Sequence, residues 1–174
     1  PELLGSTSAA AAAAAAGVRL AREAAAPGLA SGETSVAAAL AAVPARAADS
    51  YRQQLLAMAE ADLLLIETVT SWPALAAALE AAAAAWRKPV WVTLSFDLDG
   101  RLDGLAAAEL AGRLDGRVDG LGYGCGWGPA AALPVLAGLR RALPAALLVA
   151  KPSLGLPPYR VSPAQLAVWA QQAW

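Results

Sequence analysis

The amino-acid sequence predicts an α/β fold in which parallel strands alternate with helices. Four short runs of β-branched or aliphatic residues are separated by longer alanine-rich stretches that favour helices. The runs begin at residues 63, 90, 118 and 147, so their starts are 27, 28 and 29 residues apart. That spacing fits one strand, one helix and two short loops, and its repetition is typical of a TIM-type (β/α) barrel.

The chain is too short for a whole barrel of this type. An eight-stranded barrel needs about 250 residues, so 174 residues have room for about five to six strand-helix units. We therefore expect a single domain over residues 1–174, a partial barrel that lacks its first and last strands and is truncated at both ends. An open, doubly wound sheet built from the same units is the alternative architecture.

The strands are predicted from their apolar side chains. Residues 63–66 are four consecutive aliphatic residues, and residues 90–96 are rich in β-branched and aromatic side chains. Residues 118–123 and 147–150 are expected to form the third and fourth strands. A further short strand is expected near Gly28 to Ser31, between the first two helices.

Helices are predicted from capping and breaking residues. We expect them over residues 8–26, from about Ala45 to Glu60, from 72 to about 86, over 133–141 and from 163 onward. Ser71 with Pro73, and Ser162 with Pro163, are each typical of a helix start. Pro134 follows Pro129 closely, so the helix between the third and fourth strands is expected to begin late.

Composition excludes several classes of protein. The chain has 13 basic and 14 acidic residues spread along its length and a net charge of −1, so no basic patch for nucleic acid is expected. Residues 9–16 are all alanine and gain too little from burial to span a membrane. A single cysteine and an opening without a secretory pattern predict a cytoplasmic protein.

Polar residues follow each predicted strand. These positions read Glu67-Thr68, Ser95 to Asp97, Gly124 to Gly126, and Lys151 to Ser153. Ligands of parallel α/β folds bind at the C-terminal ends of the strands, whether the sheet is a barrel or open. An acid, a hydroxyl, a thiol and an amine are therefore expected at one rim.

The one cysteine, Cys125, lies in residues 122–129, which read GYGCGWGP. The glycines allow close approach of the backbone to a ligand and leave the thiol accessible, while the structural alternative is a buried core cysteine. The chain has no histidine to serve as a base for a nucleophilic thiol. A tetrahedral zinc site needs further ligands, so Cys125 alone cannot hold zinc.

Other polar residues allow two interpretations each. Glu67 would bind an ammonium group at the rim or be a solvated loop acid. Lys151 would form a Schiff base in apolar surroundings or belong to a rigid loop. Asp97 and Asp99 resemble the start of a calcium loop, but Ala108 stands where its last ligand belongs, so we predict a turn.

Two repeated patterns carry less information. The Arg-Leu-Asp-Gly stretches at residues 101–104 and 113–116 consist of turn residues and surface charges, and we assign them no function. The glycines of residues 122–128 would also suit a phosphate cradle, but their spacing fits neither the dinucleotide-binding fingerprint nor the P-loop.

Four segments together resemble the homocysteine S-methyltransferases. They are residues 63–70 (LLLIETVT), 89–97 (PVWVTLSFD), 122–129 (GYGCGWGP) and 150–157 (AKPSLGLP). Their order and spacing also resemble that family, which includes the homocysteine-binding barrel of cobalamin-dependent methionine synthase and the betaine and S-methylmethionine enzymes. The similarity covers nearly the whole chain and is best after Tyr51.

The resemblance implies roles for three residues. Cys125 matches a family cysteine whose thiolate binds zinc, and Glu67, beside Thr68 in a Glu-Thr motif, matches the glutamate that binds the amino group of homocysteine. It implies a methyltransferase that uses zinc to activate the homocysteine thiol and makes methionine, hence methionine biosynthesis. The partners implied are homocysteine, a methyl donor, and cobalamin- or folate-binding domains of a larger protein.

The sequence also departs from the family pattern. Gly124 stands where the family has an asparagine, residues 152–155 read PSLG in place of Pro-Asn-Ala-Gly, and the Gly-Gly-Cys-Cys motif with the other thiolates is missing. We therefore expect the chain as given to be inactive alone. The alternative is a non-catalytic barrel remnant that binds an amino acid or a partner protein.

Overall fold

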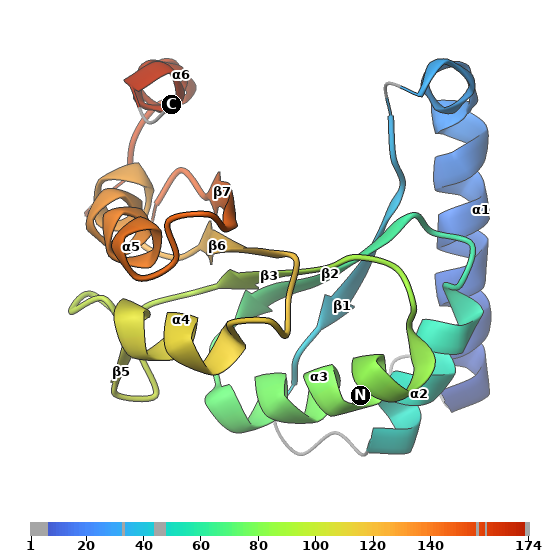
Figure 1. The fold of residues 1–174 in the computed structure, drawn as a ribbon. Helices are drawn as coiled ribbons and strands as arrows, with labels where there is room; N and C mark the ends of the chain where they lie inside the picture. The colour runs from blue at the N-terminus through green and yellow to red at the C-terminus, as the bar shows by residue number, and fades with distance from the viewer. Residues whose placement is uncertain (1–6, 33, 44–47, 156, 159, 173–174) are drawn as a thin grey trace. The chain divides into compact units, whose positions relative to one another are not determined.

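The computed structural model describes residues 7–32, 34–43, 48–155, 157–158 and 160–172 (Figure 1). The chain divides into two compact units. The first unit comprises residues 1–66 and 73–90, and the second comprises residues 67–72 and 91–174. Strand β2 (Leu63–Val69) therefore contributes its first residues to one unit and its last residues to the other.

The first unit contains α1 (Thr7–Ser31), β1 (Ala37–Ala41), α2 (Ala48–Ala57), the start of β2 and most of α3 (Trp72–Ala85). Helix α1 packs against α2. The strand predicted at Gly28 to Ser31 is wrong, because these residues end α1. The strand is β1 instead, whose sequence AAALA has low β-propensity but alternates exposed and buried residues. The predicted start of the second helix, Ala45, lies outside the described residues.

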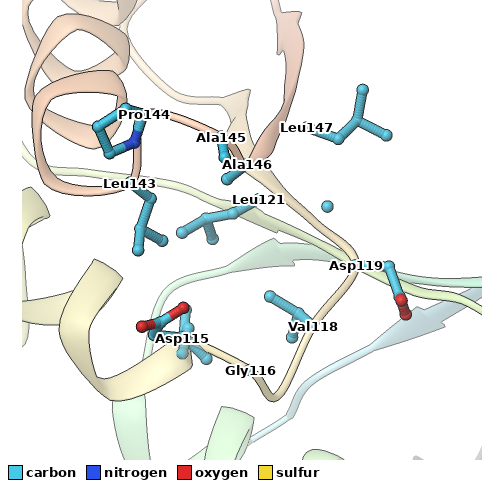
Figure 2. A pocket seen from close by; sticks show the side chains of 12 residues that line it. Asp115, Gly116, Val118, Asp119, Leu121, Leu143, Pro144, Ala145, Ala146 and Leu147 are labelled. Atoms are coloured by element: carbon cyan, nitrogen blue, oxygen red, sulfur yellow. The ribbon is translucent and has the colours of Figure 1, made fainter.

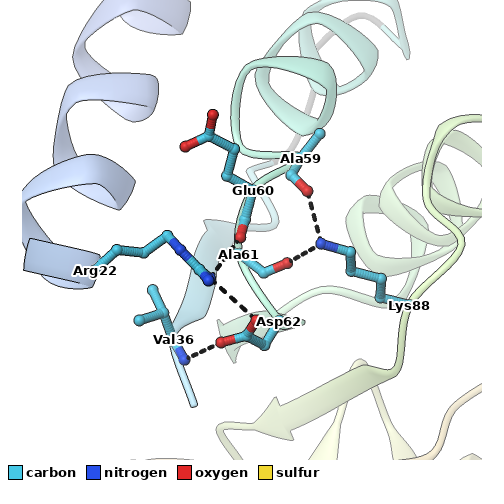
Figure 3. A network of polar contacts seen from close by, with 7 residues as sticks. All are labelled: Arg22, Val36, Ala59, Glu60, Ala61, Asp62 and Lys88. Atoms are coloured by element: carbon cyan, nitrogen blue, oxygen red, sulfur yellow. Dashed lines mark hydrogen bonds and ion pairs between the residues drawn. The ribbon is translucent and has the colours of Figure 1, made fainter. Parts of the chain in front are cut away.

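A polar network in the first unit joins α1, the residues before β2 and the segment after α3 (Figure 3). The Asp62 carboxylate accepts the Val36 N–H at 2.7 Å and pairs with Arg22 at 3.1 Å. Lys88 donates from Nζ to the carbonyl oxygens of Ala59 and Ala61, at 2.8 and 2.6 Å. These contacts hold the loop between α2 and β2.

The second unit contains the end of β2, all but the first residue of β3 (Val90–Leu94), β6 (Gly120–Cys125) and β7 (Leu147–Pro152). Strand β6 pairs in parallel with β3 on one side and with β7 on the other. The Ser95 N–H donates to the Val69 carbonyl at 2.8 Å, which places the end of β2 beside the end of β3. The order of neighbouring strands, β1-β2-β3-β6-β7, follows the order of the chain.

Helices and a hairpin complete the second unit. They are β4 (Arg101–Leu102), β5 (Leu105–Ala106), α4 (Ala107–Leu114), α5 (Pro129–Ala142) and α6 (Pro163–Gln172). Helix α5 packs on β6, β7 and α4. Asp103 and Gly104 both have positive φ, at 49° and 75°, as a tight hairpin turn requires. The turn predicted in residues 101–104 is found at Asp103 and Gly104, whereas Arg101 and Leu102 form strand β4.

The start of α5 differs from the prediction. The helix begins at Pro129 rather than near residue 133, and Gly128 is its N-cap. Proline is favourable in the first turn because the N–H that it lacks has no partner there. Pro134 lies inside the helix and removes one internal N–H donor, which the helix tolerates because Ala132, Val135, Leu136 and Leu139 are buried.

The α/β class predicted from the sequence is confirmed. Among the described residues five strand-helix units follow one another, as in part of a TIM-type barrel. The strands supply core residues to both units. Leu64 and Ile66 are fully buried in the first unit, and Leu94 and Tyr123 are fully buried in the second. Within the described ranges, each helix is too short or too polar to cross a bilayer.

Candidate functional site

All the predicted rim residues lie in the second unit. Glu67 and Thr68 are near the C-terminal end of β2, Cys125 is the last residue of β6, and Lys151 is near the end of β7. Because parallel strands end at the same edge of the sheet, these side chains meet. The structure thus brings together the acid, hydroxyl, thiol and amine that the sequence predicted at one rim.

Thr68 and Cys125 are in direct contact. The Thr68 Oγ1 atom lies 3.2 Å from the Cys125 Sγ atom, within hydrogen-bond distance for sulfur. Both residues have positive φ, 56° for Thr68 and 54° for Cys125. Among the described non-glycine residues, Asp103 alone shares this feature. A β-branched residue with positive φ is costly, and such strain gathers at functional sites, so this contact is the centre of the candidate site.

Thr93 supports Thr68 from β3. It is fully buried, and its Oγ1 atom accepts the Thr68 N–H at 3.2 Å. The same hydroxyl occupies the space beside Gly124, where an added Cβ would lie 2.6 Å from Thr93 Oγ1 and 2.8 Å from Thr93 Cβ. Gly124 therefore has no room for a side chain. This packing gives a physical reason for glycine at the position where the resembled family has asparagine.

Ser153 fixes the loop that carries Cys125. Its N–H donates to the Cys125 carbonyl at 3.1 Å, and its hydroxyl donates to the Gly126 carbonyl at 3.0 Å. The Gly155 N–H in turn donates to the Ser153 hydroxyl at 3.1 Å. The end of β7 and the loop after it therefore hold the backbone on both sides of the thiol.

Tyr123 also holds the loop that carries Cys125. Its hydroxyl accepts the Trp127 N–H at 3.0 Å, and its ring stacks on Phe96 with centroids 6.1 Å apart. Burial raises the pKa of the Tyr123 phenol, so it remains neutral. A Cβ on Gly126 would lie 2.1 Å from this hydroxyl, and Gly126 also has a φ of 63°. Glycine is therefore required immediately after Cys125.

Glu67 forms an ion pair with Lys151. The Glu67 side chain is 30% exposed and the Lys151 side chain 49% exposed, so solvent and small molecules reach both. Glu67 lies within β2 rather than in a loop. The apolar surroundings expected for Lys151 are not found, because its side chain is half exposed and its amine pairs with a carboxylate.

A cavity of about 540 Å³ opens beside Cys125 in the second unit. Ser95, Phe96, Trp127 and Ser153 line it together with Cys125. The cavity is large enough for an amino acid, and it brings apolar and polar groups to the thiol, as ligand sites do.

Asp97 lies at the edge of that cavity. Its Oδ1 atom accepts the backbone N–H groups of Asp99 and Arg101, at 3.0 and 2.8 Å. This arrangement is a side-chain-capped turn, as predicted, rather than a calcium loop.

Another cavity lies at the opposite ends of the strands (Figure 2). It measures about 350 Å³ and is lined by the end of α4, the loop before β6, and residues 143–147 before and at the start of β7. Val118, Leu121, Leu143 and Leu147 make it mainly apolar. Ligands of parallel sheets bind at the other end of the strands, so this cavity is not the candidate site.

The donor set of this chain does not hold zinc by itself. The sequence has one cysteine and no histidine. Within the described ranges, no three His, Cys, Asp or Glu side chains gather closely enough to bind a metal ion. Protein-bound zinc takes several such ligands, so Cys125 would supply one donor at most.

Sequence reasoning missed the residues that support the site. Thr93 lies in the predicted strand 90–96, but nothing in that run distinguishes a buried hydroxyl that serves the neighbouring strand. Tyr123 lies in a predicted strand and Ser153 among the predicted rim residues, but their contacts with the loop around Cys125 were not predicted. The signal available for Ser153 was its place directly after a strand end.

Comparisons with known proteins show the family and the fold of this chain. The model of the family described as homocysteine S-methyltransferase matches residues 2–174. The structure is similar to the crystal structure of the homocysteine methyltransferase MmuM from Escherichia coli in its apo form, with a TM-score of 0.65 and 21% sequence identity. The match covers 96% of this chain and 74% of that chain, and it shows a common fold. A search of curated proteins gave no match. The chain belongs to the homocysteine S-methyltransferase family and is a methyltransferase by class, as the four sequence segments predicted.

Proposed function

We propose that this chain binds homocysteine at the C-terminal ends of β2 and β6 and is part of a methyltransferase that methylates the homocysteine thiol to give methionine. The contact between Thr68 and Cys125, beside an open cavity, carries this proposal. Family membership supports homocysteine as the substrate. In the reaction, the homocysteine sulfur loses its proton and bonds to the methyl carbon, while the bond from that carbon to the donor breaks and its electron pair stays with the donor.

Glu67 would bind the ammonium group of homocysteine. Its carboxylate is partly exposed at the rim and is two residues from the end of β2, so its backbone is fixed. Charge-assisted hydrogen bonds between an ammonium and a carboxylate are about twice as strong as neutral ones. This contact would hold the amino acid so that its thiol faces Cys125.

The thiol of Cys125 would be one donor to a zinc ion that activates homocysteine. Because this chain offers no further thiol or imidazole, the residues present do not fit a zinc ion by themselves. In this chain Thr68 and Ser153 orient the thiol of Cys125. We therefore propose that residues 1–174 bind homocysteine in isolation but do not transfer a methyl group.

Isothermal titration of residues 1–174 with homocysteine under a phosphine reductant tests this function. We expect saturable binding that weakens about tenfold in Glu67→Gln, because removing one charge-assisted contact costs roughly 1.5 kcal/mol. Glu80→Gln is the matched control, since Glu80 is an exposed glutamate on α3. Absence of binding by the unmodified chain, or equal affinity in Glu67→Gln, would contradict the proposal.

A second candidate function is amino-acid binding without catalysis. The observation that favours it is the single thiolate donor. Metal analysis of the full-length gene product, purified with zinc, separates the two candidates. Stoichiometric zinc that is lost in Cys125→Ser supports the methyltransferase role, in a cytoplasmic pathway of methionine biosynthesis. Absence of zinc, together with unchanged properties in Cys125→Ser, supports simple binding.

A further inference from the structure

Charged residues are nearly absent from the strands of the main sheet. Among the described residues, β1, β2, β3, β6 and β7 carry two charged side chains, Glu67 and Lys151. They belong to different strands, both lie near a C-terminal end, and they pair with each other. Charged side chains are rarely buried in a sheet unless they are paired. A paired acid and base at the end of the strands where ligands bind is therefore a candidate for a functional role.

An α-amino acid carries the same two charges in one small molecule. We propose that Lys151 binds the α-carboxylate of the substrate while Glu67 binds its ammonium group, so that the amino acid inserts into the ion pair. This inference rests on the proposed function and adds a specificity-determining residue to it. The pair then selects zwitterionic thiols over thiols that lack either charge.

The structure allows such an exchange. The Lys151 ammonium is the end of a flexible stem with several rotatable bonds, and half of the side chain is exposed, so it can turn from Glu67 towards a ligand. The backbones of both residues stay fixed in strands. In β6 the register partner of Lys151 is Gly124, which has no side chain to stand beside the lysine.

The charge balance favours insertion. In the free protein, Glu67 and Lys151 satisfy each other through one ion pair. With a zwitterion bound, each keeps an opposite charge, and two ion pairs replace one. A ligand with an ammonium but no carboxylate gains the Glu67 contact only by leaving Lys151 unpaired. Such a ligand is therefore disfavoured by Lys151, whereas homocysteine is favoured.

The test compares homocysteine with 3-aminopropane-1-thiol, which has the thiol and the ammonium but no carboxylate. Affinities are measured by isothermal titration for residues 1–174, Lys151→Met, Lys151→Arg and the control Arg117→Met. Arg117 is an exposed cation before β6, near the other end of that strand. Thermal melts of all four proteins show whether each is folded. Lys151→Arg keeps the positive charge at this position.

We expect Lys151→Met to lower the ratio of homocysteine affinity to 3-aminopropane-1-thiol affinity about tenfold, the effect of one charge-assisted contact. Lys151→Arg and Arg117→Met should keep a ratio close to that of the unmodified chain. An unchanged ratio in folded Lys151→Met, with homocysteine still bound, overturns this inference and leaves the proposed function intact. Failure of the unmodified chain to bind homocysteine overturns both.

Discussion

Gly124 and Thr93 form a matched pair whose energetic coupling can be measured. In Gly124→Ala the new Cβ would lie 2.6 Å from Thr93 Oγ1 and 2.8 Å from Thr93 Cβ. Both distances are shorter than real Cβ contacts, and Thr93 is fully buried and already accepts the Thr68 N–H. Relief therefore requires a shift of strand β3 or β6, because the Thr93 side chain has no free space to enter.

Overpacking of this kind costs about 1–3 kcal/mol in buried sites. We expect Gly124→Ala to lose about 2 kcal/mol of unfolding free energy, which lowers the urea midpoint by roughly 1 M. Gly112→Ala is the control, because nothing lies within 4 Å of a Cβ built at Gly112 on α4. An alanine in a helix interior is favourable, so this control should gain about 0.5–1 kcal/mol.

A double-mutant cycle separates the clash from general damage. Thr93→Ala removes the nearer of the two clashing atoms and also the acceptor of the Thr68 N–H. Gly124→Ala combined with Thr93→Ala should therefore be more stable than the sum of the single effects predicts, by about 1 kcal/mol. Additive effects, or a Gly124→Ala protein as stable as the unmodified chain, would refute the reasoning.

Two further changes test the supports of the site and of the first unit. Gly126→Ala should cost about 1–3 kcal/mol in urea unfolding, because its Cβ would meet the Tyr123 hydroxyl at 2.1 Å and φ is 63°. It should also change the rate at which a disulfide reagent labels Cys125; an unaltered midpoint and rate would contradict this. Asp62→Asn should cost about 1 kcal/mol at pH 7, a modest value because Arg22 and Asp62 are 36% and 35% exposed. The Val36 N–H and Arg22 hold the pKa of Asp62 below its ordinary 3.8, so this stabilisation is present above pH 3.8 and declines as the pH falls below it. A cost for Asp62→Asn that does not shrink in acid would contradict the assignment.

The sequence predicted the fold where side-chain chemistry is strong. The strands beginning at Leu63, Val90 and Leu147 were found at their first residues, because aliphatic and β-branched runs have few alternatives. The cap at Ser162 was confirmed, since its hydroxyl accepts the Gln165 N–H and its own N–H donates to Gln165.

The sequence failed where alanine leaves little signal. Strand β1 consists of four alanines and a leucine, so its burial is decided by its neighbours rather than by its own propensity. The late start predicted for α5 was wrong because Pro134 was given too much weight against the buried face of the helix.

The sequence predicted that the residues of the candidate site lie at strand ends but not which of them are in contact. Chain position placed Glu67, Thr68 and Cys125 at strand ends, and parallel strands share an edge. Which side chains touch depends on the face of each strand and on backbone conformation. The Thr68–Cys125 contact is made by two residues with positive φ, and the Glu67–Lys151 pair joins strands that are far apart in sequence. Neither feature can be derived from local composition.

The central claim is that homocysteine binds at the C-terminal ends of these strands. Its most direct test is a titration of isotopically labelled chain with homocysteine, followed by the backbone amide signals in nuclear magnetic resonance. We predict the largest changes at Glu67, Thr68, Cys125 and Lys151, with little change near Asp119 and Leu147 at the opposite strand ends. The largest changes at those opposite ends, or no changes at all, would contradict the account.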